Sequence, residues 1–202
     1  MTSPLRLLLF LSAWLLPVTS QAFRTVVIDA GHGGRDIGGA YGKVYEKWLA
    51  LDTALRLEGM LQERGFKTVM TRRSDRFLSL GRRAQIGNSY PDSVFVSIHY
   101  NFTWKQSVQG LETFYCTGKS RALAQAVHQG MMQRARKARP NDRGVKHARY
   151  FVIRKTRTPS ILVEGGFVSN SQERGRTKEG WYREALAQGI ADGIVRFRKS
   201  YR

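Results

Sequence analysis

An apolar strand that runs into a glycine-rich loop stands near the start of this chain: Thr25-Val26-Val27-Ile28-Asp29, followed by Ala30-Gly31-His32-Gly33-Gly34. Short β-branched runs of this kind are typical of strands buried on both faces of a sheet. In open α/β sheets, ligands collect at the carboxyl ends of the strands, which is where His32 falls. The stretch therefore predicts a type of fold and one corner of a functional site.

Strand and helix patterns alternate along the rest of the chain. Further strands are expected at 67–71, 93–98, 110–115, 150–153 and 160–163, and helices at 46–64, 80–88, 120–137 and 180–199. Gly65 follows the first helix in the position of a C-cap. No repeat or linker interrupts the alternation, which predicts a single α/β domain with a largely parallel central sheet flanked by helices.

Residues 1–22 have the layout of a secretory signal peptide. Arg6 precedes an apolar stretch over 7–18, and Ser20-Gln21-Ala22 follows as a small-residue exit. The stretch is shorter than the roughly 20 residues that span a bilayer, so no transmembrane span is expected. We expect cleavage after Ala22 and export to the periplasm, the cell envelope or the medium, which leaves one domain over 23–202. An uncleaved anchor and an internal amphipathic helix are the alternatives.

Composition indicates a globular chain with an unusual charge. The 202 residues are 42% hydrophobic and 24% charged, which is ordinary for a folded domain. Lys and Arg number 34 against 15 Asp and Glu, a net charge of +19, and such a protein attracts polyanions. Because export is expected, nucleic acid is not expected as a partner. The single cysteine, Cys116, excludes an intramolecular disulfide and a multi-cysteine metal site.

Four side chains that suit metal-assisted hydrolysis are expected to converge at one edge of the sheet. His32, His99 and Glu164 each follow a predicted strand, and Glu46 opens the first helix, where the helix dipole favours a carboxylate. Two imidazoles and one carboxylate form the open shell of hydrolytic zinc sites, and a second carboxylate serves as general base. Singly, each residue has an ordinary alternative as a loop histidine or a helix-start acid; together the four favour a site.

Seven motifs occur in the order found in one enzyme family. They are Val26-Val27-Ile28-Asp29-Ala30-Gly31-His32-Gly33-Gly34, Tyr45-Glu46-Lys47, Thr71-Arg72-Arg73-Ser74-Asp75, Leu78-Ser79-Leu80 with Arg83 and Asn88, Ser97-Ile98-His99-Tyr100-Asn101, Asp142-Arg143-Gly144-Val145 and Val163-Glu164-Gly165-Gly166-Phe167-Val168-Ser169-Asn170. With them the chain resembles the zinc-dependent N-acetylmuramoyl-L-alanine amidases of bacteria, cell-wall enzymes whose domain opens with Asp-x-Gly-His-Gly-Gly. The motifs extend over nearly all of 23–199.

The resemblance implies a reaction and a role for each site residue. Zn²⁺ would be held by His32, Glu46 and His99, and Glu164 would be the catalytic glutamate. The substrate would be peptidoglycan, hydrolysed at the amide between N-acetylmuramic acid and the L-alanine of the stem peptide, and 23–202 would be the catalytic domain. We expect Asn101 to contact substrate or orient a ligand. The motifs identify no activator protein.

The chain departs from the family's motif pattern at two positions. Ala30 replaces the family's usual proline, and Gly165 replaces a larger residue, which we expect to alter the substrate pocket.

Two rival interpretations of the function remain. One is a non-catalytic wall-binding domain of the same fold, and the other is a protein whose basic surface is its whole function. Ten cations lie between Arg134 and Arg157 against one acid, Asp142, and we expect this basic face to contact anionic envelope surfaces.

Overall fold

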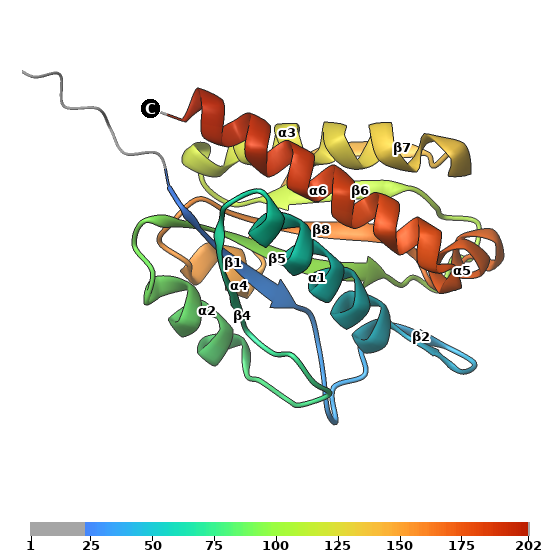
Figure 1. Ribbon diagram of the computed structural model, residues 1–202. Helices are drawn as coiled ribbons and strands as arrows, with labels where there is room; N and C mark the ends of the chain where they lie inside the picture. Colours follow the sequence, from blue (N-terminus) through green and yellow to red (C-terminus); the bar gives the residue numbers. More distant parts are fainter. Residues whose placement is uncertain (1–22, 202) are drawn as a thin grey trace, which may run out of the picture.

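A six-stranded sheet forms the centre of the computed structural model, which describes residues 23–201 (Figure 1). Its strand order is β4-β1-β5-β8-β6-β7. The strands are β1 (Thr25–Ala30), β4 (Lys67–Met70), β5 (Ser93–Asn101), β6 (Leu111–Tyr115), β7 (Asp142–His147) and β8 (Ser160–Phe167), with a separate hairpin of β2 (Ala40–Tyr41) and β3 (Val44–Tyr45). The first four strands in the sheet order are parallel, and β6 pairs antiparallel with β8. The predicted, largely parallel α/β sheet is confirmed; the predicted leader at 1–22 lies outside the described residues.

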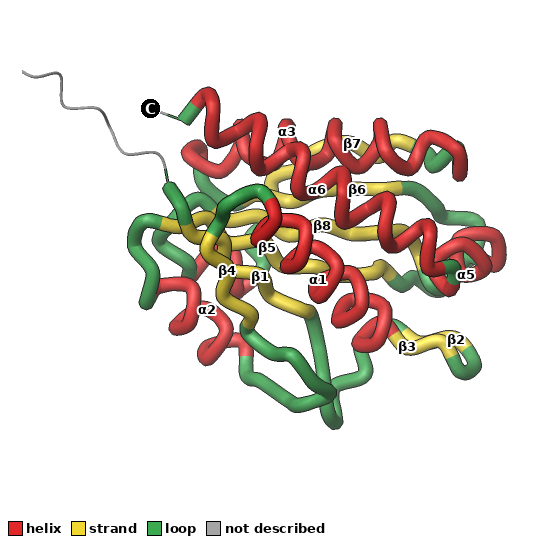
Figure 2. The backbone as a smooth tube through the Cα atoms, in the orientation of Figure 1, coloured by secondary structure: helices red, strands yellow, loops and turns green. Residues whose placement is uncertain are grey.

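Helices cover both faces of the sheet (Figure 2). The side chains of strand β1 alternate between the two faces. The helices are α1 (Glu46–Glu63), α2 (Leu80–Asn88), α3 (Gly118–Arg134), α4 (Phe151–Lys155), α5 (Ser171–Lys178) and α6 (Gly180–Ser200), with a 3-10 turn at Ala135–Ala138. Val26 and Ile28 pack in the larger core cluster under α1, α3 and α6, while Val27 lies in the smaller cluster with residues of α4. This period of two is the normal consequence of strand geometry. None of the helices described over 23–201 combines the length and apolarity that a bilayer crossing requires.

One predicted strand is wrong, and two extend at least three residues further than predicted. Residues 150–153 were expected to be a strand, but Tyr150 is the N-cap and 151–153 the first turn of helix α4, because a four-residue apolar run has no periodicity that separates strand from helix. The sheet edge is instead formed by β7, in a segment with no apolar run. Strands β5 and β8 continue through His99 and Glu164, so these side chains lie within paired strands.

Glycines let helices α3 and α6 approach closely. A Cβ placed on Gly189 of α6 would lie 2.5 Å from the carbonyl oxygen of Gly130 in α3, and a Cβ on Gly193 would clash with the backbone of Val127. Because the obstacles are backbone atoms, a side chain at these positions would push the two helices apart. The larger core cluster therefore depends on this crossing.

Replacing Gly189 with alanine is expected to lower the free energy of unfolding by about 1–3 kcal/mol, the usual cost of overpacking. Gly59→Ala is the matched control, since Gly59 lies within α1 with nothing within 4 Å of its added Cβ. The control should raise stability by up to about 1 kcal/mol through helix propensity. Urea unfolding of both variants measures the difference; equal stabilities would contradict the close crossing.

Candidate active site

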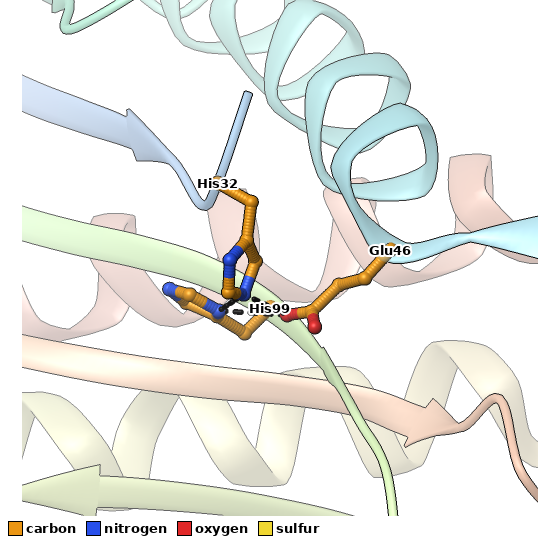
Figure 3. A group of neighbouring side chains, drawn as sticks. All are labelled: His32, Glu46 and His99. Carbon is orange, nitrogen blue, oxygen red and sulfur yellow. Dashed lines mark hydrogen bonds and ion pairs between the residues drawn. The ribbon is translucent and has the colours of Figure 1, made fainter. Parts of the chain in front are cut away.

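Three side chains from three separate elements meet beyond the carboxyl end of β1 (Figure 3). His32 comes from the glycine-rich loop after β1, Glu46 from the first residue of α1, and His99 from β5. Glu46 Oε1 lies 3.0 Å from His32 Nε2 and 2.7 Å from His99 Nδ1, and the two nitrogens are 3.1 Å apart. These separations are slightly shorter than the roughly 3.3 Å between ligand atoms of a tetrahedral zinc ion.

The hydrogen bonds around the cluster leave the facing atoms of His32 and Glu46 as acceptors. Asp36 Oδ1 lies 2.8 Å from His32 Nδ1, which places the ring proton on Nδ1 and the lone pair on Nε2. Glu46 Oε2 accepts from the Gly39 backbone N–H at 2.7 Å, and Oε1 accepts from that of Tyr100 at 3.0 Å. A neutral His32 therefore turns a lone pair toward a carboxylate oxygen. Only an added positive charge, a proton or a metal ion, resolves this contact, so the donor set fits a metal.

The pKa directions reflect the same demand for positive charge. Burial disfavours the charged form of His32, but its contacts with Glu46 and Asp36 outweigh burial and raise its pKa. Burial acts against ionisation of Glu46 as well, yet the two histidines lower the pKa of its carboxyl far below the ordinary value. Ionised Glu46 and an electron-pair donor on each ring are the forms in which these residues bind a cation.

Glu164 lies on the strand next to His99. The two residues are register partners in the parallel pair β5–β8, and on the other side Glu164 pairs with Glu112 of β6. Glu164 is 8% exposed, and its Oε2 atom has no hydrogen-bond partner among the residues at 23–201. Burial, together with the charges of Glu46 and Glu112, raises the pKa of its carboxyl well above the ordinary value. A buried carboxyl of this kind binds a proton readily.

Glu112 is a site residue that the sequence analysis missed. Its buried carboxylate accepts from Arg143 Nε at 2.8 Å, Lys146 Nζ at 2.5 Å and Asn101 Nδ2 at 2.6 Å. Asn101, expected to contact substrate or orient a ligand, is thus placed against Glu112. The available signal was an acidic residue inside the apolar run of β6, because an isolated buried carboxylate is costly without partners.

Two buried arginines hold the loop that carries His32, and they too were missed as functional residues. Arg72 donates from Nε and Nη2 to the carbonyls of Ala30 and Gly31, and Arg83 Nη2 donates to the carbonyl of His32 at 2.5 Å. His32 needs this support because its φ of 57° is left-handed, a conformation that costs a non-glycine residue about 1 kcal/mol or more. Asp29 balances the buried charge by accepting from Arg83 at 2.7 Å.

The two other histidines of the chain, His128 and His147, lie elsewhere. His128 contacts Thr113 and Asp142, and His147 contacts the carbonyl of Cys116, so neither belongs to the cluster. A Cβ on Gly165 would meet the buried Tyr100 ring at 2.7 Å, and the expected effect of this residue on the substrate pocket stays a prediction.

The ten-cation segment at 134–157 is divided in its use. Arg134 pairs with Asp192, and Arg143 and Lys146 pair with Glu112. Three cations of the segment are therefore paired with acidic residues of the same chain. The remaining cations are the candidates for an outward-facing charged surface.

The fold and the site together define an α/β domain that brings two histidines and a glutamate together at one edge of its sheet. A family model described as N-acetylmuramoyl-L-alanine amidase matches residues 26–196. N-acetylmuramoyl-L-alanine amidase LytC of Bacillus subtilis is 35% identical over 86% of this chain and 35% of its own length. The probable cell wall amidase LytH of Staphylococcus epidermidis is 31% identical over 86% of the chain and 58% of its length.

Solved structures agree with these relatives. The catalytic domain of CwlV, an amidase from Bacillus (Paenibacillus) polymyxa, superposes with a TM-score of 0.81 at 37% identity, over 86% of this chain and 97% of that one. A Clostridium difficile 630 amidase gives 0.84 at 32% identity, over 90% and 100%. This chain belongs to the N-acetylmuramoyl-L-alanine amidase family, and the resemblance seen in its motifs is confirmed. It spans about a third of LytC and less than two thirds of LytH.

Replacing Asp29 with asparagine is expected to cost about 3–5 kcal/mol of unfolding free energy, because Arg83 would remain buried without its counter-ion. Asp192→Asn is the control: Asp192 also pairs with arginines, Arg64 and Arg134, but at the surface, where such pairs contribute at most about 1 kcal/mol. Urea unfolding at neutral pH compares the two.

The role of Asp29 also predicts the direction in which stability changes with pH. Burial works against ionised Asp29, but Arg83, Ser97 and Thr71 outweigh burial and lower its pKa. The stabilisation is therefore present above the unfolded value of about 3.9 and is lost as the pH falls below it. The wild type and Asp192→Asn should lose stability over this acid range, and Asp29→Asn should lose less; equal slopes would contradict the account.

Proposed function

We propose that this protein is a zinc-dependent N-acetylmuramoyl-L-alanine amidase that hydrolyses peptidoglycan at the bond between N-acetylmuramic acid and L-alanine. The observation that carries the proposal is the cluster of His32, Glu46 and His99, with Glu164 in register beside it. Family membership supplies the class of reaction. The proposal takes residues 23–202 as the catalytic domain.

His32, Glu46 and His99 would hold the metal, because each offers one possible ligand atom and these atoms lie close together. When bound, zinc supplies a Lewis acid that polarises the amide carbonyl and acidifies water. Asp36 fixes the tautomer of His32, while the backbone N–H groups of Gly39 and Tyr100 hold the Glu46 carboxylate in place. The site is thus oriented before any ligand arrives.

Glu164 would move the proton of the reaction. Its carboxylate accepts a proton from the attacking water as the new C–O bond forms at the amide carbon. It returns that proton to the alanine nitrogen as the C–N bond breaks, which leaves a muramyl carboxylic acid and a free peptide amine. Burial and neighbouring carboxylates strengthen its hold on a proton, as a general base requires. Glu112, neutralised by Arg143 and Lys146, would position this part of the site.

Removing one metal ligand should remove the metal. His99→Ala is expected to lose stoichiometric zinc and at least about 10³-fold in activity, since two ligands hold zinc poorly. His147→Ala is the control, because His147 is exposed and its ring contacts the Cys116 carbonyl and the Tyr115 ring, away from the cluster. Metal analysis of both purified variants and activity after chelation and zinc return decide the matter. Full zinc content in His99→Ala would refute the ligand set.

Glu164→Gln should separate metal binding from proton transfer. The variant keeps the shape of the side chain and loses its basicity, so kcat is expected to fall about 10²–10⁴-fold while zinc content stays at one per chain. Glu184→Gln serves as control, since Glu184 is a surface residue of α6 paired with Arg56. Assays on purified peptidoglycan measure both. Wild-type activity in Glu164→Gln would exclude its role.

Export and wall attachment complete the proposal. The leader pattern at 1–22 supports export, and N-terminal sequencing of the exported protein is expected to begin at Phe23.

The exposed cations of the 134–157 segment would hold the enzyme on anionic envelope polymers. Changing Arg136, Arg149 and Lys155 to glutamine should weaken binding to insoluble sacculi at low salt, whereas the same change at Arg24, Lys67 and Lys199 should not. Equal binding of the two triple variants would contradict this role.

A further inference from the structure

An aromatic groove lies beside the candidate metal centre, between the β2–β3 hairpin and the loop that follows β5. It has a volume of about 260 Å³, and the residues that line it include Tyr41, Phe102, Thr103, Trp104, Gln106 and Ser169. None of the described residues that line it is charged. The Trp104 ring is 91% exposed, and it meets Phe102 edge-on with ring centroids 5.3 Å apart.

The groove is held in a defined position relative to the metal ligands. A Cβ on Gly39 would lie 2.7 Å from Phe102 Cβ and 3.4 Å from Glu46 Oε2, so Phe102 and the Glu46 carboxylate flank the same backbone position. On the far side, the Thr103 N–H donates to Ser169 Oγ at 3.1 Å. Asn170 Nδ2 donates to the Gln106 carbonyl at 2.8 Å, which ties the loop after β5 to the loop after β8.

The opposite side of the centre has a different chemistry. There the row of register partners runs from His99 through Glu164 to Glu112, and Arg143 and Lys146 from the edge of the sheet surround the last carboxylate. The two cations balance the carboxylates of Glu112 and Glu164, so this side carries charges of both signs. The site thus has an uncharged, aromatic side next to Glu46 and a charged side, with cations at the sheet edge, beyond Glu164.

The substrate of the proposed reaction has the same asymmetry. On the acyl side of the scissile amide stands a neutral pyranose ring, and on the amine side a peptide that carries carboxylates. Pyranose rings present a face of C–H groups that packs on an indole and an edge of hydroxyl groups that needs hydrogen-bonding partners. Trp104 offers the first, and Thr103, Gln106 and Ser169 offer the second.

From this match we infer that the groove binds the glycan strand, with a sugar ring stacked on Trp104, and so fixes the direction in which the substrate crosses the centre. The inference rests on the proposed function for the identity of the sugar polymer. The exposure of Trp104 is accounted for, because the indole is left for a ligand and not buried in the core. Arg174, whose guanidinium lies 3.9 Å from the centre of the Tyr41 ring, braces the hairpin wall of the groove.

Calorimetric titration with glycans that contain no amide substrate tests this inference. One probe is a peptide-free tetrasaccharide of alternating N-acetylglucosamine and N-acetylmuramic acid; the other is a tetrasaccharide of N-acetylglucosamine alone, which has no carboxylate for the metal centre. Trp104→Ala is expected to weaken binding of both by at least about tenfold. Since the ring is almost fully exposed, the variant should fold as the wild type does.

Trp181→Ala is the matched control, since Trp181 is also an exposed tryptophan (49%) but lies on α6 and lines a different cavity. It should bind both glycans as the wild type does. No binding by the wild type at millimolar glycan, or equal binding by Trp104→Ala, would overturn the inference. A loss confined to the carboxylate-bearing probe would also overturn it, because stacking acts on both. Neither probe has a bond to cleave, so a protein without amidase activity still gives a result.

Discussion

A buried carboxylate facing two imidazole nitrogens is the constraint around which this structure is arranged. Glu46 Oε1 lies within 3.0 Å of both rings, and with Asp36 accepting from His32 no distribution of protons on neutral rings satisfies the contact. Holding acceptors this close requires rigid backbone. Gly38 allows the approach, since a Cβ there would lie 2.6 Å from both Glu46 Oε2 and the His32 ring. Arg83 holds the His32 backbone in its left-handed conformation by donating to the His32 carbonyl. A bound cation would relieve the repulsion between these buried acceptor atoms.

The topology of the sheet gives the site its two unlike sides. Parallel strands β1 and β5 bring the loop of His32 and the side chain of His99 to one edge, and β8 adds Glu164 in register. The reversal at β6 then places Glu112 in the same row, and β7 supplies the cations that neutralise it. The hairpin and the loop after β5 form the other, aromatic side.

How much of this the sequence could predict depended on how local each signal was. The buried strands, the amphipathic helices and the residues that follow strands have periodicity or position, and the fold class and the convergence of His32, Glu46 and His99 came from them. Strand β7 was not predicted because its pairing with β6 leaves no apolar pattern in its own segment. Helix α4 was predicted as a strand because its short apolar run does not distinguish a strand from a helix. Arg72 and Arg83 were missed as functional, since carbonyl partners 41 and 51 residues away leave no trace in a local window. Glu112 had one local signal, an acidic residue within an apolar run, but its partner Arg143 is 31 residues away.

The central claim is that this centre directs hydrolysis to one amide of peptidoglycan. Mass spectrometry of the soluble products of purified sacculi treated with the zinc-loaded protein tests it directly. The account predicts intact stem peptides with a free L-alanine amino terminus, and glycan strands that keep the lactyl carboxylate of muramic acid. Products cut within the stem peptide or between sugars would contradict it.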